Sequence, residues 1–266
     1  MMTHRPEYSA PDRLWSTVRR WALAWGRIIY WGAVVLVLVL SPSSYTRAGR
    51  RSLMRHLYHG TAPNLLGFTV LAALLCLVIT HIVVVTALSY GLSRYALEMV
   101  IRVLVLELIP LTAALFVAMR CTIPNGTQLA LLRQSGHLAR LSHAGADPIR
   151  VELLPRAVAG VFACITLAAL SCVVALVLAY LGVYGFSLAG LPSYTRMFGH
   201  VFAPSFTLVF VIKTVLFSLA VALIPMAAGL YDTGERTQPD SELGGLARMF
   251  AVLLLIEIGS LVGNYY

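Results

Sequence analysis

The chain has 266 residues, of which 59% are hydrophobic and only 12% charged, and its mean hydropathy is +0.82. Soluble domains are about one quarter charged, so this composition excludes an ordinary soluble enzyme and a disordered chain. The apolar residues form several long runs and do not alternate as in a barrel strand. The sequence therefore predicts an all-α polytopic membrane protein. Its net charge of +9 indicates anionic lipid and cytoplasmic loops, and not nucleic acid.

The first apolar stretch, residues 21–40, has basic clusters on both sides. The flanking arginines are Arg5, Arg13, Arg19 and Arg20 before the stretch and Arg47, Arg50, Arg51 and Arg55 after it. Positive charge resists translocation, so both ends favour the cytoplasm, which a simple span does not allow. We predict that 10–58 is a membrane-reclining amphipathic element, within a cytoplasmic N-terminal region of residues 1–60. A true first span is the alternative.

Five stronger apolar segments follow, each suited to a bilayer core that needs ~20 residues to cross. They cover residues 63–91, 97–119, 155–182, 203–230 and 243–263. Residues 61–266 are thus predicted to form a five-span membrane domain. The loop 120–156 is rich in arginine, whereas the loops 92–96 and 184–202 carry one arginine each. The positive-inside rule therefore places the N-terminus and the 120–156 loop in the cytoplasm.

Charged side chains inside spans are costly, and so they mark candidate functional sites. Glu107, Lys213 and Glu257 lie within the second, fourth and fifth spans. Glu107 and Lys213 indicate either a structural interhelical pair or a polar patch that meets a headgroup, whereas for Glu257 the structural interpretation is favoured. Glu98 and Arg102 are four residues apart and are placed to pair. In an α-helix Arg102 and Glu107 lie about 140° apart, so we expect them to face different neighbours.

Motifs for catalysis, metal binding and nucleotide binding are absent from the sequence. The only lysine has no neighbouring glycine, so there is no Walker P-loop. The histidines and cysteines lack metal-ligand spacing, and no serine stands in a nucleophile elbow. We therefore predict no catalytic residue, no metal site and no cofactor held by the chain itself.

Residues 127–144 have leucines at mostly helical spacing, and the segment ends at Gly145 with Pro148 shortly after it. The pattern predicts a short amphipathic cytoplasmic helix between two spans. Two roles fit this pattern equally well. In the first the helix lies on the membrane surface, and in the second it docks into a groove of a cytoplasmic partner.

Several motifs resemble those of the MlaE/YrbE permeases, the membrane subunits of ABC transporters that move phospholipids with MCE-domain proteins. Residues 106–110 resemble the start of the family's ELGP…AAL segment, residues 145–149 its G-x-DP motif, and residues 154–156 its PR motif. Residues 212–217 resemble its IK…F motif. The resemblance covers most of the chain, about 45–262.

The resemblance implies an interfacial elbow helix plus five transmembrane helices, assembled as a homodimer in the bacterial inner membrane. It implies that a separate subunit binds ATP and that 127–144 is the coupling helix seated on this ATPase. The dimer would enclose a lipid cavity that opens towards a periplasmic MCE protein. The implied lipid-cavity residues are Glu107, Lys213 and Arg102. The implied coupling residues are Arg133, His137, Leu138, Arg140, Leu141, Asp147 and Pro148.

The chain departs from the family in the coupling segment, where Gln128, Gly136 and Ser142 stand at positions that usually hold acids. This departure predicts a partner groove of altered charge, or weakened coupling. Two further hypotheses stay open beside the permease subunit. One is a non-transporting membrane scaffold derived from such a permease, and the other is a polytopic enzyme that acts on lipid with Glu107 or His81 as acid or base.

Overall fold

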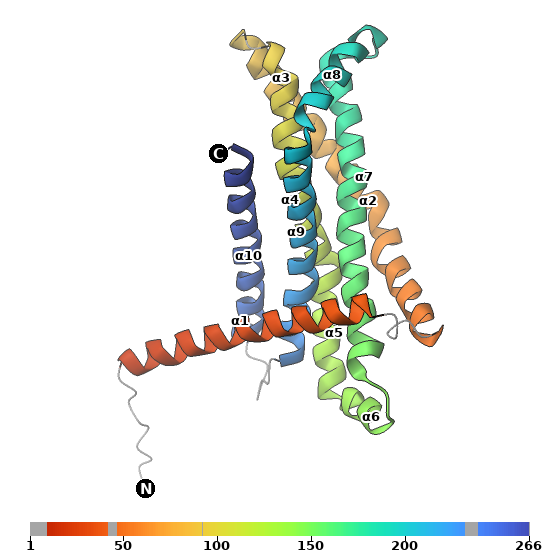
Figure 1. Cartoon of the computed structure of the whole chain (residues 1–266), viewed down its shortest axis with the longest axis vertical. Helices are drawn as coiled ribbons and strands as arrows, with labels where there is room; N and C mark the ends of the chain where they lie inside the picture. Colours follow the sequence, from red (N-terminus) through yellow and green to blue (C-terminus); the bar gives the residue numbers. More distant parts are fainter. Residues whose placement is uncertain (1–9, 42–46, 92, 232–238, 266) are drawn as a thin grey trace.

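The computed structural model describes residues 10–41, 47–91, 93–231 and 239–265, and all regular elements in these ranges are helices. Figure 1 shows a bundle of long helices crossed near one end by α1. The long helices are α1 (Ala10–Leu40), α2 (Arg47–Ser89), α7 (Leu154–Tyr184), α9 (Pro204–Tyr231) and α10 (Pro239–Tyr265). The short α-helices are α3 (Ser93–Val100), α4 (Ile109–Val117), α5 (Ile123–Gln134), α6 (His137–His143) and α8 (Leu191–Val201). Three π-helical stretches and one 3-10 turn connect them: η2 (Ile101–Leu108), η3 (Ala118–Thr122), η4 (Ile149–Leu153) and η5 (Leu188–Gly190).

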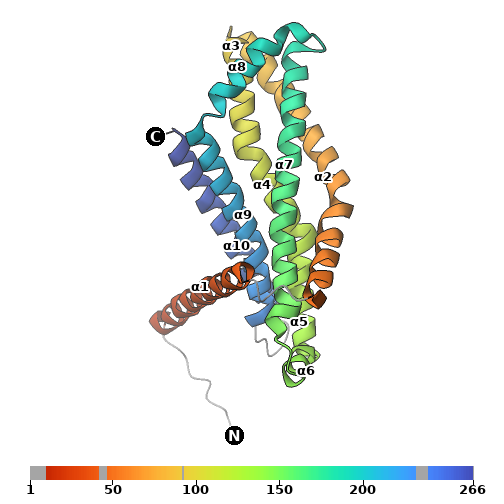
Figure 2. The ribbon, with the colours of Figure 1, turned by 45° about the vertical axis from the view of Figure 1, so that its right-hand side comes forward.

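Within the described ranges, five helical segments are long and apolar enough to cross a membrane, which confirms the predicted five-span architecture. They are Arg51–Ala87, Leu97–Gln134, Ile149–Tyr184, Pro204–Leu230 and Gly244–Asn264. In α1 only a shorter segment, Ile28–Val39, is strongly apolar. Figures 1 and 2 place α1, α5 and α6 at one end of the bundle and α3 and α8 at the other. The arginine-rich connection therefore lies at the same end as the N-terminal helix.

The N-terminal helix α1 crosses the bundle near one end (Figure 1) and has both a buried and an exposed apolar face. Trp31 and Val35 are buried in a cluster with residues of α5, α7 and α9, whereas Ile29 and Val37 are exposed. Such a helix beside membrane spans suits the interface. The reclining element predicted over 10–58 extends too far, because residues 47–58 belong to α2 and continue unbroken into the first span.

The second span contains two π-helical stretches, and each of them ends two residues before a proline. η2 precedes Pro110 and η3 precedes Pro124, and η4 stands in the same relation to Pro155 at the start of α7. Proline has no N–H and its ring crowds the carbonyl four residues earlier. The hydrogen bonds therefore reach back five residues, as from the N–H of Ile109 to the carbonyl of Leu104. The helix accommodates both prolines in this way and runs through α5, well beyond the predicted end of the span.

The segment 127–144 forms two helices, so the single helix predicted there is wrong. Its first part belongs to α5, which continues the second span, and only α6 stands apart. Gly136 separates the two helices with a φ of 69°, a left-handed conformation that glycine adopts without a steric penalty. Arg140 Nη2 donates a hydrogen bond of 2.9 Å to the carbonyl of Ser135 across the break.

The helices α5 and α9 cross with their backbones in contact. A Cβ on Gly229 would lie 2.2 Å from the carbonyl oxygen of Gly126, and a Cβ on Gly126 would lie 2.6 Å from the carbonyl oxygen of Pro225. Small residues permit this close approach of helices in membranes. The crossing fixes α5, the continuation of the second span, against the fourth span.

We expect Gly229→Ala to destabilise the protein, because the new methyl group meets the backbone of Gly126 and not a movable side chain. Overpacking costs about 1–3 kcal/mol, which should lower the melting temperature of the purified protein in detergent. Gly67→Ala on α2 is the matched control, since a Cβ there meets no described atom within 4 Å. Equal melting temperatures for the two variants would contradict a tight crossing.

Candidate functional site

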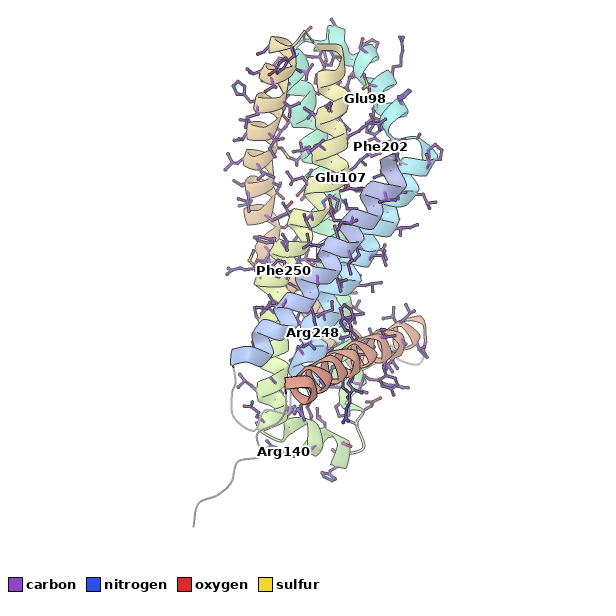
Figure 3. The ribbon with its side chains drawn as sticks, turned by 90° about the vertical axis from the view of Figure 1, so that its left-hand side faces the viewer. Glu98, Glu107, Arg140, Phe202, Arg248 and Phe250 are labelled. Atoms are coloured by element: carbon purple, nitrogen blue, oxygen red, sulfur yellow. The ribbon has the colours of Figure 1, made fainter. Side chains whose placement is uncertain are left out.

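Three charged side chains from three spans meet inside the bundle. Lys213 Nζ on α9 donates a hydrogen bond to Glu107 Oε2 on η2 and lies 2.9 Å from Glu257 Oε2 on α10. Asn264 Nδ2, also on α10, donates to Glu107 Oε1 at 3.2 Å. We call these four residues the ion cluster. Figure 3 shows Glu107 below Glu98 and beside the upper part of α10, and the cluster connects η2, α9 and α10 inside the spans.

A carbonyl freed by proline contributes to the surroundings of the lysine. Pro110 has no N–H to donate to the carbonyl of Leu106, four residues before it. Lys213 Nζ donates to this oxygen at 3.3 Å, and Nζ also lies 5.7 Å from the centre of the Phe217 ring. The ammonium is thus surrounded by three oxygen atoms, from Leu106, Glu107 and Glu257.

The ion cluster is almost entirely shielded from solvent. The exposed fraction of the side chain is 1% for Lys213, 11% for Glu107 and 16% for Glu257. Charges at membrane depth are costly unless they are paired, and a buried pair needs good geometry to offset its desolvation. The Glu107–Lys213 pair is therefore a structural contact between the second and fourth spans. Its role in lipid binding stays a prediction.

Arg102 lies outside the ion cluster. Its guanidinium pairs with Glu98 at 3.0 Å, as the spacing predicts, and lies 4.8 Å from the centre of the Phe206 ring on α9. In a π-helix residues five apart are joined across one turn, so Arg102 and Glu107 both face α9. The expectation that they face different neighbours is wrong, because it assumed α-helical rotation. In Figure 3, Glu98, Phe202 and Glu107 follow one another down this side of the bundle.

Several predicted coupling residues connect the α5–α6 end to the rest of the structure. Arg133 on α5 donates a hydrogen bond to the carbonyl of Leu230, and so it caps the last turn of α9. Leu138 packs beside the buried cluster that contains Trp31 of α1, and Leu141 is half-buried. Arg133 therefore ties α5 to α9, and Leu138 packs α6 against the buried cluster.

The turn after α6 is closed by Asp147 and Pro148. Asp147 Oδ1 accepts a hydrogen bond of 3.0 Å from the backbone N–H of Ile149, and its other oxygen lies 3.5 Å from Arg150 Nε. Pro148 precedes the first residue of η4 with a helical backbone conformation. The two residues therefore lie between α6 and the start of the third span. Arg140, on α6, is exposed.

Glu152, which the sequence analysis did not include among the coupling residues, links α6 to α7. Its carboxylate pairs with Arg156 at 2.9 Å and lies 3.9 Å from His137 Nε2. Arg156 is buried at the base of α7, and its Nε and Nη1 have no hydrogen-bond partner among the described residues. The spacing of Glu152 and Arg156 predicts their pairing, but the approach of His137 depends on how α6 folds back.

In the part of the chain that the structure describes, no three His, Cys, Asp or Glu side chains are placed to hold a metal ion. His56 and His59 share a face of α2, and His56 Nδ1 lies 2.9 Å from the carbonyl of Ser52. Inside the described spans, the ion cluster brings charged side chains of three helices together.

The five apolar spans and the charged side chains buried between them define a multi-pass helical membrane protein. A family model described as Permease MlaE matches residues 53–261. The match covers most of the chain, so the chain belongs to the MlaE permease family, as the resemblance of its motifs predicted. No curated protein matches the chain. The matched region contains Glu107, Lys213 and Glu257, whereas α1 and Asn264 lie outside it.

We expect Lys213→Met to destabilise the protein strongly, because it leaves the buried carboxyl groups of Glu107 and Glu257 without their cation. Breaking a buried pair costs about 3–5 kcal/mol, which the melting temperature of the purified protein should report. Arg196→Met, at an exposed cation on α8, is the matched control. Adding Glu107→Gln and Glu257→Gln to Lys213→Met should restore much of the loss. A triple variant as unstable as Lys213→Met alone would show that the lysine acts through packing and not through its charge.

Proposed function

We propose that the chain is the transmembrane permease subunit of an ABC transporter that moves phospholipid, or a related lipid, between the bacterial inner membrane and a periplasmic MCE-domain protein. A separate ATPase subunit binds ATP, and two copies of the chain form a homodimer with their N-termini in the cytoplasm. Membership of the MlaE permease family supports the permease class. The finer parts of the proposal draw on the geometry of the second span and its two ends.

The observation that carries the proposal is the continuity of the second span. A single helical segment runs from Leu97 to Gln134. It holds Glu107 in the ion cluster and, further along, Gly126 in the tight crossing with α9. α6 begins only three residues after Gln134. A displacement of α6 would therefore reach the charges inside the membrane along one helix, as coupling to an ATPase requires.

The position and charge of α6 support docking to a cytoplasmic protein. Figures 1 and 2 show α6 further from the bundle centre than α1, and Figure 3 places Arg140 at this end. α1 suits the membrane interface, so a helix beyond it extends past the membrane surface. Arg140, His143 and Arg150 are exposed there. A partner groove lined with acidic side chains would complement them.

In the lipid-binding part of the proposal, the three predicted residues have different roles. Glu107 offers a carboxylate at the edge of the ion cluster, and Lys213 is too deeply buried to reach a headgroup and instead holds the carboxylates. Arg102 is more exposed, and its planar guanidinium suits a lipid phosphate. ATP-driven movement would change these contacts between two states, which lets the protein bind and release a lipid.

A non-transporting scaffold is the second candidate, favoured by the short α6 and by the missing acids at positions 128, 136 and 142. Stimulation of the ATPase activity in the assembled complex distinguishes the two functions. A permease couples the two subunits and raises ATP hydrolysis when lipid is present, whereas a scaffold leaves hydrolysis unchanged.

We expect Arg140→Glu to weaken co-purification of the ATPase subunit roughly tenfold, because it places a negative charge against an acidic groove. Membrane insertion should not change, since Arg140 is exposed. Arg196→Glu on α8, at the other end of the bundle, is the matched control. Quantifying both subunits after affinity purification measures the effect. Unchanged recovery of the ATPase with the Arg140 variant would remove the docking role of α6.

Replacing Glu107 by Ala should reduce lipid transfer about tenfold, the equivalent of ~1.4 kcal/mol, while the dimer still assembles. The change removes the carboxylate that both Lys213 and Asn264 contact. The assay follows a fluorescent phospholipid from liposomes that hold the complex to the MCE protein. Leu74→Ala, at an exposed position on α2, is the control. Normal transfer by the Glu107 variant would leave this residue with a structural role alone.

A further inference from the structure

The ion cluster contains more negative charge than its lysine balances. Glu107 and Glu257 approach the same ammonium group. The nearest cation along η2, Arg102, is already paired with Glu98. Among the described residues, the titratable groups that meet here are therefore one carboxylate from η2, one from α10 and the ammonium from α9. With both carboxylates ionised, the cluster carries one surplus negative charge.

We propose that the ion cluster is a proton-binding site, and that Glu257 holds the proton in the conformation described here. An uncompensated carboxylate in an apolar interior is costly enough that such groups neutralise instead. Two carboxylates that share one site rarely ionise together, because each disfavours the charge of the other. A single proton removes the surplus charge and leaves a neutral cluster of one ion pair and one carboxylic acid.

The hydrogen bonds indicate which of the two carboxyl groups is protonated. Both oxygen atoms of Glu107 accept hydrogen bonds, Oε2 from Lys213 and Oε1 from Asn264. Glu257 Oε2 is buried and lies 2.9 Å from Nζ, but no described group gives it a hydrogen bond of good geometry. Hydrogen bonds to the ionised form favour that form. Glu107 is therefore the carboxylate, and Glu257 is the acid.

An acceptor for the hydroxyl of a protonated Glu257 is the Glu107 carboxylate, which lies within hydrogen-bonding reach of the Glu257 side chain. Ser260 and Asn264 follow Glu257 by three and seven residues, the spacing of neighbours along one helix face. Ser260 Oγ and Asn264 Oδ1 are buried and have no hydrogen-bond partner among the described residues. A carboxylic acid donates a hydrogen bond, whereas a carboxylate does not. The protonated form therefore donates to the Glu107 carboxylate, whereas two ionised carboxylates at this distance would repel each other.

Proton binding at this site would be linked to the packing of α10 on α9 and η2. The proton favours the closed cluster, because it removes the surplus charge. When the pH rises and the proton leaves, the surplus charge returns and favours separation of α10, which exposes Glu257 to water. By linkage, a movement that separates the helices releases the proton. This inference goes beyond the proposed function and stands on the charges and hydrogen bonds of the cluster.

Infrared spectroscopy of the full-length protein tests the proposal. We expect the carbonyl band of a protonated carboxylic acid at neutral pH, shifted in D2O, in maltoside detergent, which has no carbonyl group of its own. Glu257→Gln should abolish the band. Glu107→Gln should abolish it as well, because the remaining carboxyl group can then ionise beside Lys213. Glu98→Gln, at an acid paired outside the cluster, is the matched control and should keep the band.

A wild-type protein without the band at neutral pH would overturn the proposal, and this result needs no variant to fold. A band that both cluster variants retain would also overturn it, since the proton would then lie elsewhere. Size-exclusion chromatography establishes that each variant is folded. The readout needs neither ATPase nor lipid transfer, so the failure of the proton site is distinguishable from the failure of the permease function.

Discussion

The ammonium group of Lys213 is the interaction on which the arrangement of the spans depends. It joins η2, α9 and α10 through oxygen atoms of Leu106, Glu107 and Glu257. α10 needs this contact, because only 22% of its most apolar window is buried within the bundle. Apolar packing in a membrane gives little preference for helix over lipid, so polar contacts decide where a peripheral span lies. The lysine therefore sets the position of the fifth span.

The lysine site follows from a single chemical property of proline. The missing N–H of Pro110 widens the helix before it and leaves the Leu106 carbonyl for Lys213. The same widening turns Arg102 and Glu107 towards α9. Pro124 repeats the effect in η3 without ending the helix. Prolines tend to break helices in water, but here the span stays continuous. The prolines instead decide at which positions along the span polar groups meet the neighbouring helices.

The sequence predicts those features that depend on length and local spacing. The five spans follow from their apolar runs, and the Glu98–Arg102 pair follows from a spacing of four residues. The contacts that α10 makes with Lys213 and Glu107 were missed, because tertiary packing decides which residues meet. The sequence did contain one indication of these contacts. Glu257 and Asn264 are seven residues apart, which puts both on one face of a helix. The predicted orientation of Glu107 relative to Arg102 was also wrong, because a π-helical stretch changes which side of the helix each residue faces.

The two contacts of the second span differ in how they respond to force. At Gly126 the backbones of α5 and α9 touch, and no side chain lies between them to rearrange. At Glu107 the contact consists of charges and hydrogen bonds, which have alternative partners and discrete arrangements. Packed cores move as rigid units, whereas polar interfaces switch between states. A displacement that starts at α6 therefore carries α5 and α9 together, and the change of contacts falls on the ion cluster and on α10.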